Sequence, residues 1–576
     1  MNTPLVIEVK DLSVAFNTGR EESIAVKNLS FNLHKGEIAG IVGESGSGKS
    51  VTALAIMGLL QCPPAKITSG EILFYGENAQ PVDIISLPEF KMRQLRGNHI
   101  SMVFQEPMTS LNPVYRCGEQ VAEVILEHQK VTSKEAKMKV VSLFEEVLLP
   151  HPEDIYKAYP HQLSGGQKQR VMIAMAIANN PSVIIADEPT TALDVTVQKT
   201  ILELLKNIRN KYQIAIIFIT HDLGVVADIA DKVIVMYKGE CVEENTVQQI
   251  FKAPVHKYTK GLIACRPDMK KRLKLLPTVS DFLNNELQSD TLKKILEQEI
   301  SKEERKENHI QLYKGEPLIK VHHLNTSFIV SSPFFSFKPK VFEVLKDISF
   351  DVYKGETLGL VGESGCGKTT LGRSILRLIE PSSGEVFYNN VNITALSKNE
   401  FRKLRKELQI IFQDPYSSLN PRMTVGQAIL EPMEVHNILS SFKLRKERAI
   451  ELLEKVGLDE THYNRYPHEF SGGQRQRIVI ARTLALNPRF IICDESVSAL
   501  DVSIQAQVLN LLNQLKNEFG LTYIFISHDL SVVKYLADRI IIMKEGEIIE
   551  TNEADALYSN PKEEYTRKLI NAIPKI

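Results

Sequence analysis

The chain has 576 residues and contains one glycine-rich octapeptide pattern twice. Residues 43–50 read GESGSGKS, and residues 362–369 read GESGCGKT. An apolar run precedes each copy and a helical pattern follows it, which is the setting in which such a loop presents backbone N–H groups to phosphate at a helix N-terminus. The lysine of this loop reaches the β- and γ-phosphates, and its last hydroxyl residue holds Mg²⁺. The sequence therefore predicts two α/β nucleotide-binding cores in one chain.

A second pair of motifs is an apolar run that ends in two carboxylates. Residues 183–188 read VIIADE, and residues 490–495 read FIICDE. A continuous apolar run is typical of a parallel strand covered on both faces, and ligands of such sheets lie at the carboxyl ends of the strands. We expect Asp187 and Asp494 to approach Mg²⁺. Glu188 and Glu495, one residue further on, are placed to polarise the attacking water as general bases.

A third apolar strand, residues 214–220 or 522–527, ends in a histidine in each half. A histidine at a strand end is ordinarily a packing residue. Here His221 and His528 are separated by 307 positions, the same separation as Asp187 and Asp494. The repeated placement favours a functional reading, in which each histidine contacts the γ-phosphate and links it to the catalytic carboxylate.

The fourth repeated motif is LSGGQ at residues 163–167, matched by FSGGQ at residues 470–474. Its small residues let backbone N–H groups and a hydroxyl approach an anion, and the apolar helix that follows directs its N-terminus at a phosphate. Two anion-binding helix termini in each half imply two phosphates or two partners. With this motif, nearly the whole chain outside the linker resembles the ATP-binding cassette (ABC) family, whose ATP-bound domains pair head to tail.

The resemblance implies an α/β fold with two tandem ABC-type P-loop nucleotide-binding domains, each with a RecA-like core and a helical signature subdomain. It also implies ATP and Mg²⁺ as cofactors, and two active sites, because neither half has lost its carboxylates or its histidine. Phe16 and Phe328 match the family's adenine-stacking ring, although a phenylalanine in an alternating strand is equally a core residue. The implied catalytic residues are Glu188, His221, Gln105, Glu495, His528 and Gln413. The implied metal ligands are Ser50, Gln105, Asp187, Thr369, Gln413 and Asp494. The implied nucleotide contacts are Gly43, Ser45, Gly46, Gly48, Lys49, Ser50, Val51, Gly362, Ser364, Gly365, Gly367, Lys368, Thr369, Thr370, Phe16, Phe328, Ser164, Gly165, Gly166, Gln167, Ser471, Gly472, Gly473 and Gln474.

The spacing of the motifs predicts the domain boundaries. Lys49 and Lys368 differ by 319 positions and Gln105 and Gln413 by 308, so the first copy has 11 extra residues, which we place in a surface loop near 61–80. We expect a first nucleotide-binding domain with its C-terminal tail over 1–268, a charged and partly helical linker over 269–314, and a second domain with its tail over 315–576. The linker composition is typical of a spacer.

Charge and hydropathy restrict the partners. Lys and Arg number 69 against 70 Asp and Glu, a net charge of −1, so no strongly basic surface indicates nucleic acid. The longest apolar runs fall well short of the ~20 residues that a membrane-spanning helix needs. No signal peptide opens the chain, which predicts a cytoplasmic location. Any transport across a membrane must therefore use partner subunits.

Several segments are similar to one branch of the family, the bacterial dipeptide, oligopeptide and nickel importers. They are QEPMTSLNP at 105–113, QDPYSSLNP at 413–421, and the tails HKYTKGL at 256–262 and EYTRKL at 564–569. The resemblance implies an ATPase that energises peptide import, bound peripherally at the cytoplasmic face of the inner membrane. Its partners would be two multi-span permeases and a substrate-binding protein.

Other readings stay open at this point. A tandem cassette can act on ribosomes, but the nearly charge-balanced linker does not favour an RNA partner. An exporter is possible, because fold alone does not fix the direction of transport. The cargo is also open among dipeptides, oligopeptides, glutathione, peptide antibiotics and nickel chelates, with peptide as the best single reading.

Overall fold

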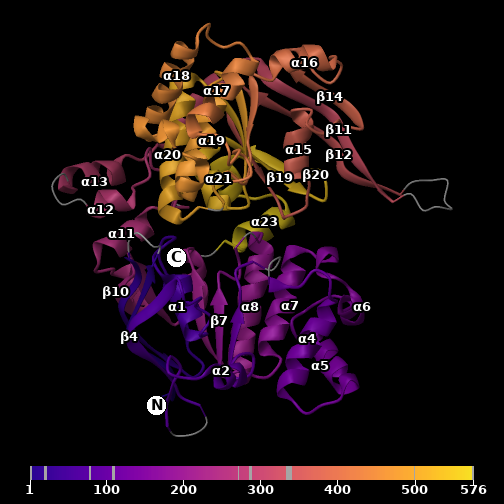
Figure 1. Cartoon of the computed structure of the whole chain (residues 1–576). Coiled ribbons are helices and arrows are strands. Elements are labelled where there is room, and N and C mark those ends of the chain that lie inside the picture. Colours follow the sequence, from indigo (N-terminus) through magenta and orange to yellow (C-terminus); the bar gives the residue numbers. More distant parts are fainter. Residues whose placement is uncertain are drawn as a thin grey trace. The chain divides into compact units, whose positions relative to one another are not determined.

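The computed structural model describes residues 3–17, 22–76, 80–106, 110–191, 193–269, 271–283, 288–331, 340–498 and 500–573. Two compact units make up this part of the chain, the first ending at Ile263 and the second running from Ala264 to Ile573 (Figure 1). Residues 107–109 of the first glutamine segment, and Ala192 and Ala499 after the carboxylate pairs, lie outside the described residues.

The first unit is built on a six-stranded sheet of order β10-β9-β3-β8-β7-β6. All neighbours in it are parallel except β9 and β10. The central strands β3, β7 and β8 are buried along their whole length, as expected for strands covered on both faces. The strands are β3 (Ile38–Val42), β6 (Ile100–Val103), β7 (Val183–Asp187), β8 (Ala215–Thr220), β9 (Lys232–Tyr237) and β10 (Glu240–Thr246). Parallel order brings the phosphate loop after β3, the carboxylates at the end of β7 and the histidine after β8 to one edge.

A second, antiparallel sheet of order β2-β1-β4-β5 completes the strands of the first unit. It consists of β1 (Leu5–Asn17), β2 (Glu22–His34), β4 (Ala65–Phe74) and β5 (Val82–Asp83). The described helices are α1 (Lys49–Ile56), α2 (Glu89–Leu95), α4 (Cys117–His128), α5 (Ser133–Glu146), α6 (Pro152–Lys157), α7 (Gly165–Ile177), α8 (Val195–Tyr212), α9 (Leu223–Ile229), α10 (Val247–Lys252) and α11 (Lys257–Ala264). Helices α4, α5, α6 and α7 pack on one another as a separate helical group (Figure 1).

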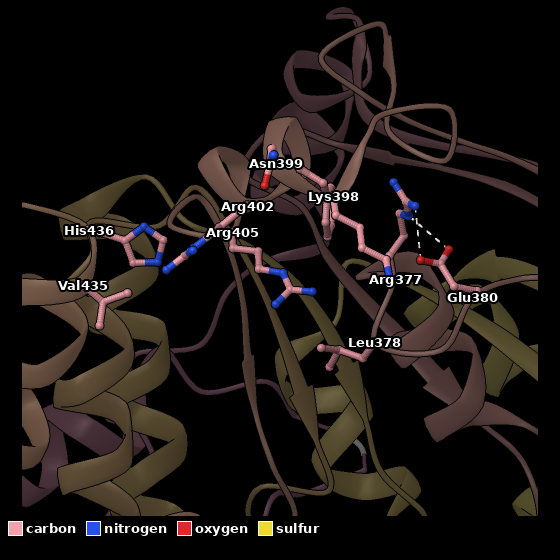
Figure 2. Close-up of a pocket in the computed structure, with 10 residues that line it drawn as sticks. Arg377, Leu378, Glu380, Lys398, Asn399, Arg402, Arg405, Val435 and His436 are labelled. Carbon is pink, nitrogen blue, oxygen red and sulfur yellow. Dashed lines mark hydrogen bonds and ion pairs between the residues drawn. The ribbon is translucent and has the colours of Figure 1, made fainter.

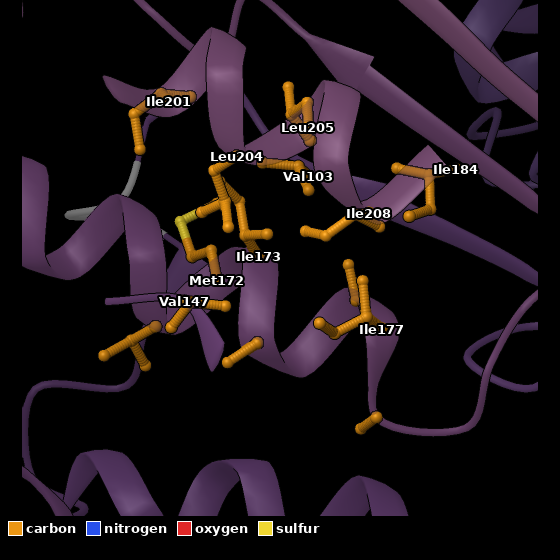
Figure 3. Close-up of a cluster of buried hydrophobic side chains, with 14 of the residues drawn as sticks. Val103, Val147, Met172, Ile173, Ile177, Ile184, Ile201, Leu204, Leu205 and Ile208 are labelled. Atoms are coloured by element: carbon orange, nitrogen blue, oxygen red, sulfur yellow. The ribbon is translucent and has the colours of Figure 1, made fainter. Parts of the chain in front are cut away.

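A continuous apolar core joins this helical group to the six-stranded sheet. Figure 3 shows Met172, Ile173 and Ile177 of α7 beside Ile184 of β7 and Leu205 of α8, all buried. Because these contacts join the signature helix α7 to the carboxylate strand β7, a shift of α7 would disturb the packing of β7.

The second unit repeats this architecture, with sheets of order β16-β17-β18-β13-β19-β20 and β12-β11-β14-β15. Its strands are β11 (Pro317–Ser331), β12 (Lys340–Tyr353), β13 (Thr357–Val361), β14 (Ser383–Tyr388), β15 (Val391–Asn392), β16 (Leu408–Ile411), β17 (Phe490–Asp494), β18 (Thr522–Ile526), β19 (Arg539–Lys544) and β20 (Glu547–Glu553). Its helices are α12 (Val279–Leu283), α13 (Gln288–Glu297), α14 (Lys302–Leu312), α15 (Lys368–Ile375), α16 (Lys398–Leu404), α17 (Val425–Val435), α18 (Phe442–Lys455), α19 (Gly472–Leu484), α20 (Val502–Phe519), α21 (Leu530–Leu536), α22 (Ala554–Ser559) and α23 (Glu564–Asn571). The predicted α/β class, with a core and a helical subdomain in each half, is confirmed.

Two local predictions need correction. The predicted surface loop over 61–80 is wrong in its middle, because β4 occupies Ala65–Phe74 and pairs with β1. Part of the extra length of the first copy lies in β4 itself, which has 10 residues against 6 in its counterpart β14, and most of the rest follows the strand. The sequence predicts helical patterns after the phosphate loops over residues 51–60 and 370–378. The helices end earlier, at Ile56 and Ile375, because Gly58 and Arg377 adopt left-handed backbone angles of φ 62° and 47°.

The segment between the cassettes packs on the second unit, which begins at Ala264. Arg272 donates to the Ala537 carbonyl at 3.0 Å, and Leu276 exchanges two hydrogen bonds with the Asn510 side chain at 2.9 and 2.8 Å. Buried Arg305 of α14 forms an ion pair with Glu553 at 2.5 Å. These contacts give the segment a structural role on the second unit, beyond the spacer that its composition suggests.

Candidate nucleotide sites

The two phosphate loops have the same conformation. Gly48 and Gly367 precede α1 and α15 with φ of 100° and 104°, angles that glycine adopts readily. Lys49 Nζ donates to the carbonyls of Gly43 and Glu44 at 2.8 and 2.9 Å, and Lys368 does the same in the second unit at 2.7 and 2.8 Å. The other predicted loop contacts, Ser45, Gly46, Ser364 and Gly365, lie in the loops, and Val51 and Thr370 in the first turns of the helices. The loops thus hold a lysine over a nest of backbone N–H groups.

Two of the three residues predicted to bind Mg²⁺ in each unit meet at the end of the carboxylate strand, whereas Gln105 and Gln413 donate to the catalytic glutamates instead. Ser50 Oγ donates to Asp187 Oδ1 at 3.2 Å, and Thr369 Oγ1 donates to Asp494 Oδ1 at 2.9 Å. Burial raises the pKa of Asp187 to about 6, with the neighbouring Glu188 carboxylate adding to the rise, and burial also raises the pKa of Asp494. A cation would relieve this penalty on the charged form.

This donor set fits Mg²⁺. Within the described ranges there is no group of three or more His, Cys, Asp or Glu side chains that could hold a metal. Mg²⁺ needs no such group, because it binds through one or two carboxylates, hydroxyl oxygen, water and substrate phosphates.

Glu188 is the centre of a hydrogen-bonded cluster in the first unit. Its carboxylate accepts from Gln105 Nε2 and Thr191 Oγ1, each at 2.9 Å, and lies 3.2 Å from His221 Nδ1. Burial opposes ionisation, but the hydrogen bond and charge of His221 and the Thr191 hydroxyl outweigh it and lower the pKa of Glu188 to about 2. The carboxylate is therefore ionised at neutral pH. It is suited to orient and polarise a water molecule more than to keep a proton.

Glu495 has a similar but looser environment. Gln413 Nε2 donates to it at 2.8 Å, and His528 Nδ1 lies 3.5 Å away. Burial again opposes ionisation, and His528 lowers the pKa of Glu495; burial opposes the charging of His528, and Glu495 raises its pKa. Ser498 stands where the first unit has Thr191, and its hydroxyl donates to the Glu495 backbone carbonyl instead of the carboxylate. The two sites share their parts but differ in this third donor.

Both glutamates have a left-handed backbone, with φ of 47° at Glu188 and at Glu495. A non-glycine residue in this region costs roughly 1–3 kcal/mol and persists where the surroundings enforce it. The backbone N–H of Glu188 donates to Ile219 at the end of β8, and that of Glu495 donates to Ile526 at the end of β18. These bonds hold each carboxylate beside the strand that leads to the histidine.

The signature segments form helix N-termini. Ser164 caps α7 by accepting from the Gln167 backbone N–H at 3.3 Å, while Gln167 Oε1 accepts from the Ser164 N–H at 2.9 Å. Ser471 and Gln474 make the same reciprocal pair at the start of α19. The glycines between them, Gly165, Gly166, Gly472 and Gly473, begin the helices. Whether each segment closes the nucleotide site of the other unit stays a prediction.

The two predicted adenine-stacking rings differ in exposure. Phe328 in β11 is 41% exposed, whereas Phe16 in β1 is partly buried and packs against the core of the first unit. Phe328 is therefore the more accessible of the two rings. The packing of Phe16 agrees with its reading as a core residue, and stacking of either ring on adenine stays a prediction.

Sequence reasoning missed a contact between each C-terminal tail and its phosphate loop. The hydroxyl of Tyr258 in α11 accepts from the Glu44 backbone N–H at 3.0 Å, and that of Tyr565 in α23 accepts from the Glu363 N–H at 3.3 Å. Tyr258 is fully buried and packs on Tyr237, with ring centroids 4.3 Å apart. The repetition of the tyrosine in both tails was the available signal. Each tail therefore supports the second residue of its phosphate loop.

A pair of α/β units, each with a phosphate loop, a carboxylate strand and a serine-capped signature helix, defines a tandem ABC-type ATPase. Comparison with known proteins agrees: the ABC transporter family model matches residues 26–191 and 345–498, and the chain belongs to this family. The family model for the C-terminal region of oligopeptide/dipeptide transporters matches residues 242–291 and 549–576, which confirms the branch suggested by the two tails.

Individual relatives resemble the chain over nearly its whole length. The glutathione import ATP-binding protein GsiA of Salmonella choleraesuis (strain SC-B67) is 47% identical over 578 residues, covering 99% of this chain and 89% of that protein. GsiA of Escherichia coli (strain K12) is 46% identical over 570 residues, with the same coverage. The chain is therefore an ATP-binding and ATP-hydrolysing subunit of an ABC importer of the dipeptide/oligopeptide class.

Proposed function

We propose that this subunit energises the import of a small peptide, with glutathione as the first cargo to test. The observation that carries the proposal is the match to GsiA proteins through both cassettes and both tails in a single chain. Glutathione is a tripeptide, so this cargo lies within the peptide class that the tail motifs indicate.

The catalytic assignment follows the geometry of each unit. In the first site, Lys49 and the loop N–H groups would bind the β- and γ-phosphates, with Ser50, Asp187 and Gln105 around the metal. Bound Mg²⁺ would neutralise phosphate charge during hydrolysis. Glu188 would orient the attacking water, and His221 would hold Glu188 in place. Their counterparts in the second unit would do the same work.

The head-to-tail pairing of the family supplies the remaining parts. The first site would be closed by residues 471–474 and the second by residues 164–167. ATP would then hold the two units together, and hydrolysis followed by phosphate release would let them separate. Two membrane permeases would convert this motion into alternating access.

The location follows from the same proposal. No helix in the described part of the chain is long and apolar enough to cross a membrane. We place the subunit peripherally on the cytoplasmic face of the inner membrane, where it would dock on two multi-span permeases fed by a substrate-binding protein.

Uptake of labelled cargo by cells tests the proposal. A strain that lacks the gene is complemented with the wild-type chain or with Lys49→Ala plus Lys368→Ala, and uptake of labelled glutathione and of a labelled dipeptide is compared. Restoration of glutathione uptake by the wild-type chain alone is the expected result. Restoration of dipeptide uptake without glutathione uptake would move the cargo elsewhere in the peptide class, and restoration of neither would refute a role in peptide import.

A further inference from the structure

A cavity of about 370 Å³ lies where the segment between the cassettes packs on the second unit. The segment contributes Met269, Arg272 and Ile300 to its lining, and helices α21 and α22 contribute Lys534 and Tyr558. All the residues that line it belong to the second unit. Small-molecule sites in proteins measure roughly 300–1,000 Å³, so this cavity, which we call the linker cavity, is large enough to hold a small molecule.

Three cations lie close together at the linker cavity and repel one another. Arg305 of α14 pairs with Glu553 and Asp555. Lys534 lies 3.9 Å from the same Asp555, so two cations share one carboxylate. Burial and the charges of Arg305 and Arg272 lower the pKa of Lys534, and burial and the charge of Arg272 lower the pKa of Arg305 to about 10. A further negative charge in the cavity would relieve this repulsion.

Arg272 has an unused hydrogen-bond donor. Its Nη1 donates to the Ala537 carbonyl at 3.0 Å, but its Nε is buried and has no acceptor among the residues that the structure describes. Asp538, the carboxylate that most favours the charged form of Arg272, is paired instead with Lys516 at 3.0 Å and with His309 at 3.6 Å. A buried donor without an acceptor costs free energy. Because Arg272 lines the linker cavity, an anionic oxygen bound there can supply the missing acceptor.

Arg377 shows how another arginine at a cavity of this unit is satisfied by the fold alone. It lines a larger cavity of about 700 Å³ beside α16, and Figure 2 shows it paired with Glu380. Its Nε donates to Glu380 at 3.1 Å, and its Nη1 donates to two backbone carbonyls at 2.8 and 2.7 Å. Arg272 differs from it by lacking such a partner for Nε within the part of the chain that the structure describes.

The remaining lining indicates that the ligand has an organic part. Met269, Ile300 and Ile570 add apolar surface to the cavity, and the Tyr558 ring centroid lies 5.2 Å from Lys534 Nζ. A site that combines a few cations with apolar and aromatic walls suits a small organic molecule bearing a carboxylate or a phosphate. A bare inorganic ion would leave the apolar wall without a role.

The first unit has different side chains at the matching positions. The segment that begins at the histidine reads HDLSVVKYLA in the second unit and HDLGVVADIA in the first. Ala227 therefore stands where the second unit has Lys534. Asp228 stands where it has Tyr535. A carboxylate in place of the aromatic ring, beside an alanine in place of the lysine, would not favour an anion, so the proposed chemistry is specific to the second unit.

Two walls of the linker cavity lead to the second nucleotide site. Helix α21, which carries Lys534, begins at Leu530, two residues after His528. Helix α23 carries Ile570 in the cavity wall and also Tyr565, whose hydroxyl accepts a hydrogen bond from the phosphate loop. A ligand that touches both helices would restrict their movement relative to each other. Binding in the cavity is therefore placed to act on the histidine and on the phosphate loop.

We infer that the linker cavity is a regulatory site for a small organic anion, whose carboxylate or phosphate group is held by Arg272 and Lys534. The ligand acts on ATP hydrolysis through α21 and α23, at a place separate from the two nucleotide sites. The inference does not depend on which cargo the importer carries.

Calorimetric titration of the full chain tests the inference, with the nucleotide sites filled by ADP and Mg²⁺. The probes are glutathione, which carries carboxylates, glucose 6-phosphate, which carries a phosphate, and glucose, which carries neither. We expect at least one of the two anionic probes to bind with a Kd below about 1 mM and glucose to show no binding. Lys534→Ala gives the position the residue of the first unit and should weaken that binding roughly tenfold or more, because it removes a charge-assisted hydrogen bond. Lys306→Ala removes an exposed lysine of the same segment outside the cavity and should stay within about twofold of wild type.

Amine labelling of the wild-type chain provides a second measurement that needs no variant. Saturation with the binding probe should lower acetylation of Lys534 about threefold or more and leave Lys306 unchanged, because a bound anion covers the ammonium group. The probe that protects Lys534 more strongly shows whether the site prefers a carboxylate or a phosphate.

Steady-state hydrolysis of ATP measures the regulation. The bound probe should change the rate by about twofold or more in the wild-type chain and by less in Lys534→Ala. Absence of binding by both anionic probes up to about 10 mM, binding that Lys534→Ala leaves unchanged, or an unchanged rate at saturation would overturn the inference. The uptake assay for the proposed cargo is independent of all three results.

Discussion

Adjacent glycines at the start of the signature helix give a sharp test of what each one does. A Cβ added to Gly166 would lie 2.6 Å from Val197 Cγ1, a contact that requires α7 or α8 to move. A Cβ added to Gly165 would meet only Leu193 Cδ2, at an ordinary 3.6 Å. We predict that Gly166→Ala destabilises the first unit by about 1–3 kcal/mol through overpacking. Gly165→Ala leaves stability unchanged or slightly raised, because alanine loses less backbone entropy than glycine in a helix.

The same two variants should also differ in ATPase activity. The methyl group of Gly165→Ala would occupy the space through which the helix N-terminus approaches phosphate, so we expect ATP hydrolysis to fall by about 100-fold in a chain of normal stability. Calorimetry should show the transition of the first unit lowered by roughly 2–10 °C in Gly166→Ala only. Gly472 and Gly473 provide an internal repeat, with closest contacts of 3.9 and 2.3 Å. Equal destabilisation by the two alanines in either unit would refute the reasoning.

Further predictions concern the catalytic carboxylates and the tails. Replacing Glu188 and Glu495 together by Gln should retain ATP and slow phosphate release by about 100-fold or more, because the water loses its acceptor; rapid release in a rapid-quench assay would contradict their role as bases. Tyr258→Phe should weaken ATP binding at the first site by roughly 2- to 12-fold, since it removes one buried neutral hydrogen bond to the loop. Tyr565→Phe should weaken ATP binding at the second site by a smaller factor, because its hydrogen bond to the loop is longer, 3.3 Å against 3.0 Å. Site-resolved labelling with a photoreactive ATP analogue measures both effects, and weaker binding only in the Tyr565 variant would count against this account. The pair of Glu495 and His528 should stabilise the second unit most between about pH 4.5 and 6.5. Glu495 has a lowered pKa in the folded protein, so its contribution to stability is lost as pH falls through that folded-state pKa. His528 has a raised pKa in the folded protein, so its contribution is lost as pH rises through that folded-state pKa. The unfolding temperature of the wild-type chain, measured from pH 4 to 9, should therefore be highest within this range, and His528→Gln should flatten that maximum. An identical profile in the variant would show that the pair does not contribute to stability.

The parts of the fold that the sequence predicts are those fixed by local patterns. Glycine loops, fully apolar strands and serine-led helices carry their geometry within a few residues, so the arrangement of β3, β7 and β8 around Asp187 follows from their order. The hydrogen bond from Glu44 to Tyr258 joins residues 214 positions apart, and that between Leu276 and Asn510 joins residues 234 positions apart. Neither hydrogen bond can be predicted from a local sequence pattern, because nothing in the residues around either partner indicates its distant contact.

The packing of residues 264–314 decides how this protein can be divided. Asp538 of the second unit lies near Lys516, His309 and Arg272. The charges of Lys516 and Arg272 and the hydrogen bond to His309 hold its pKa well below the usual range, although burial acts in the opposite direction. A fragment that starts at the motif boundary, near residue 315, would remove the Arg272 charge and the His309 hydrogen bond and leave a buried carboxylate poorly compensated. A second cassette that folds by itself should therefore begin near residue 264. An evolutionary split of the fused chain into two proteins would be expected to leave this segment attached to the second of them.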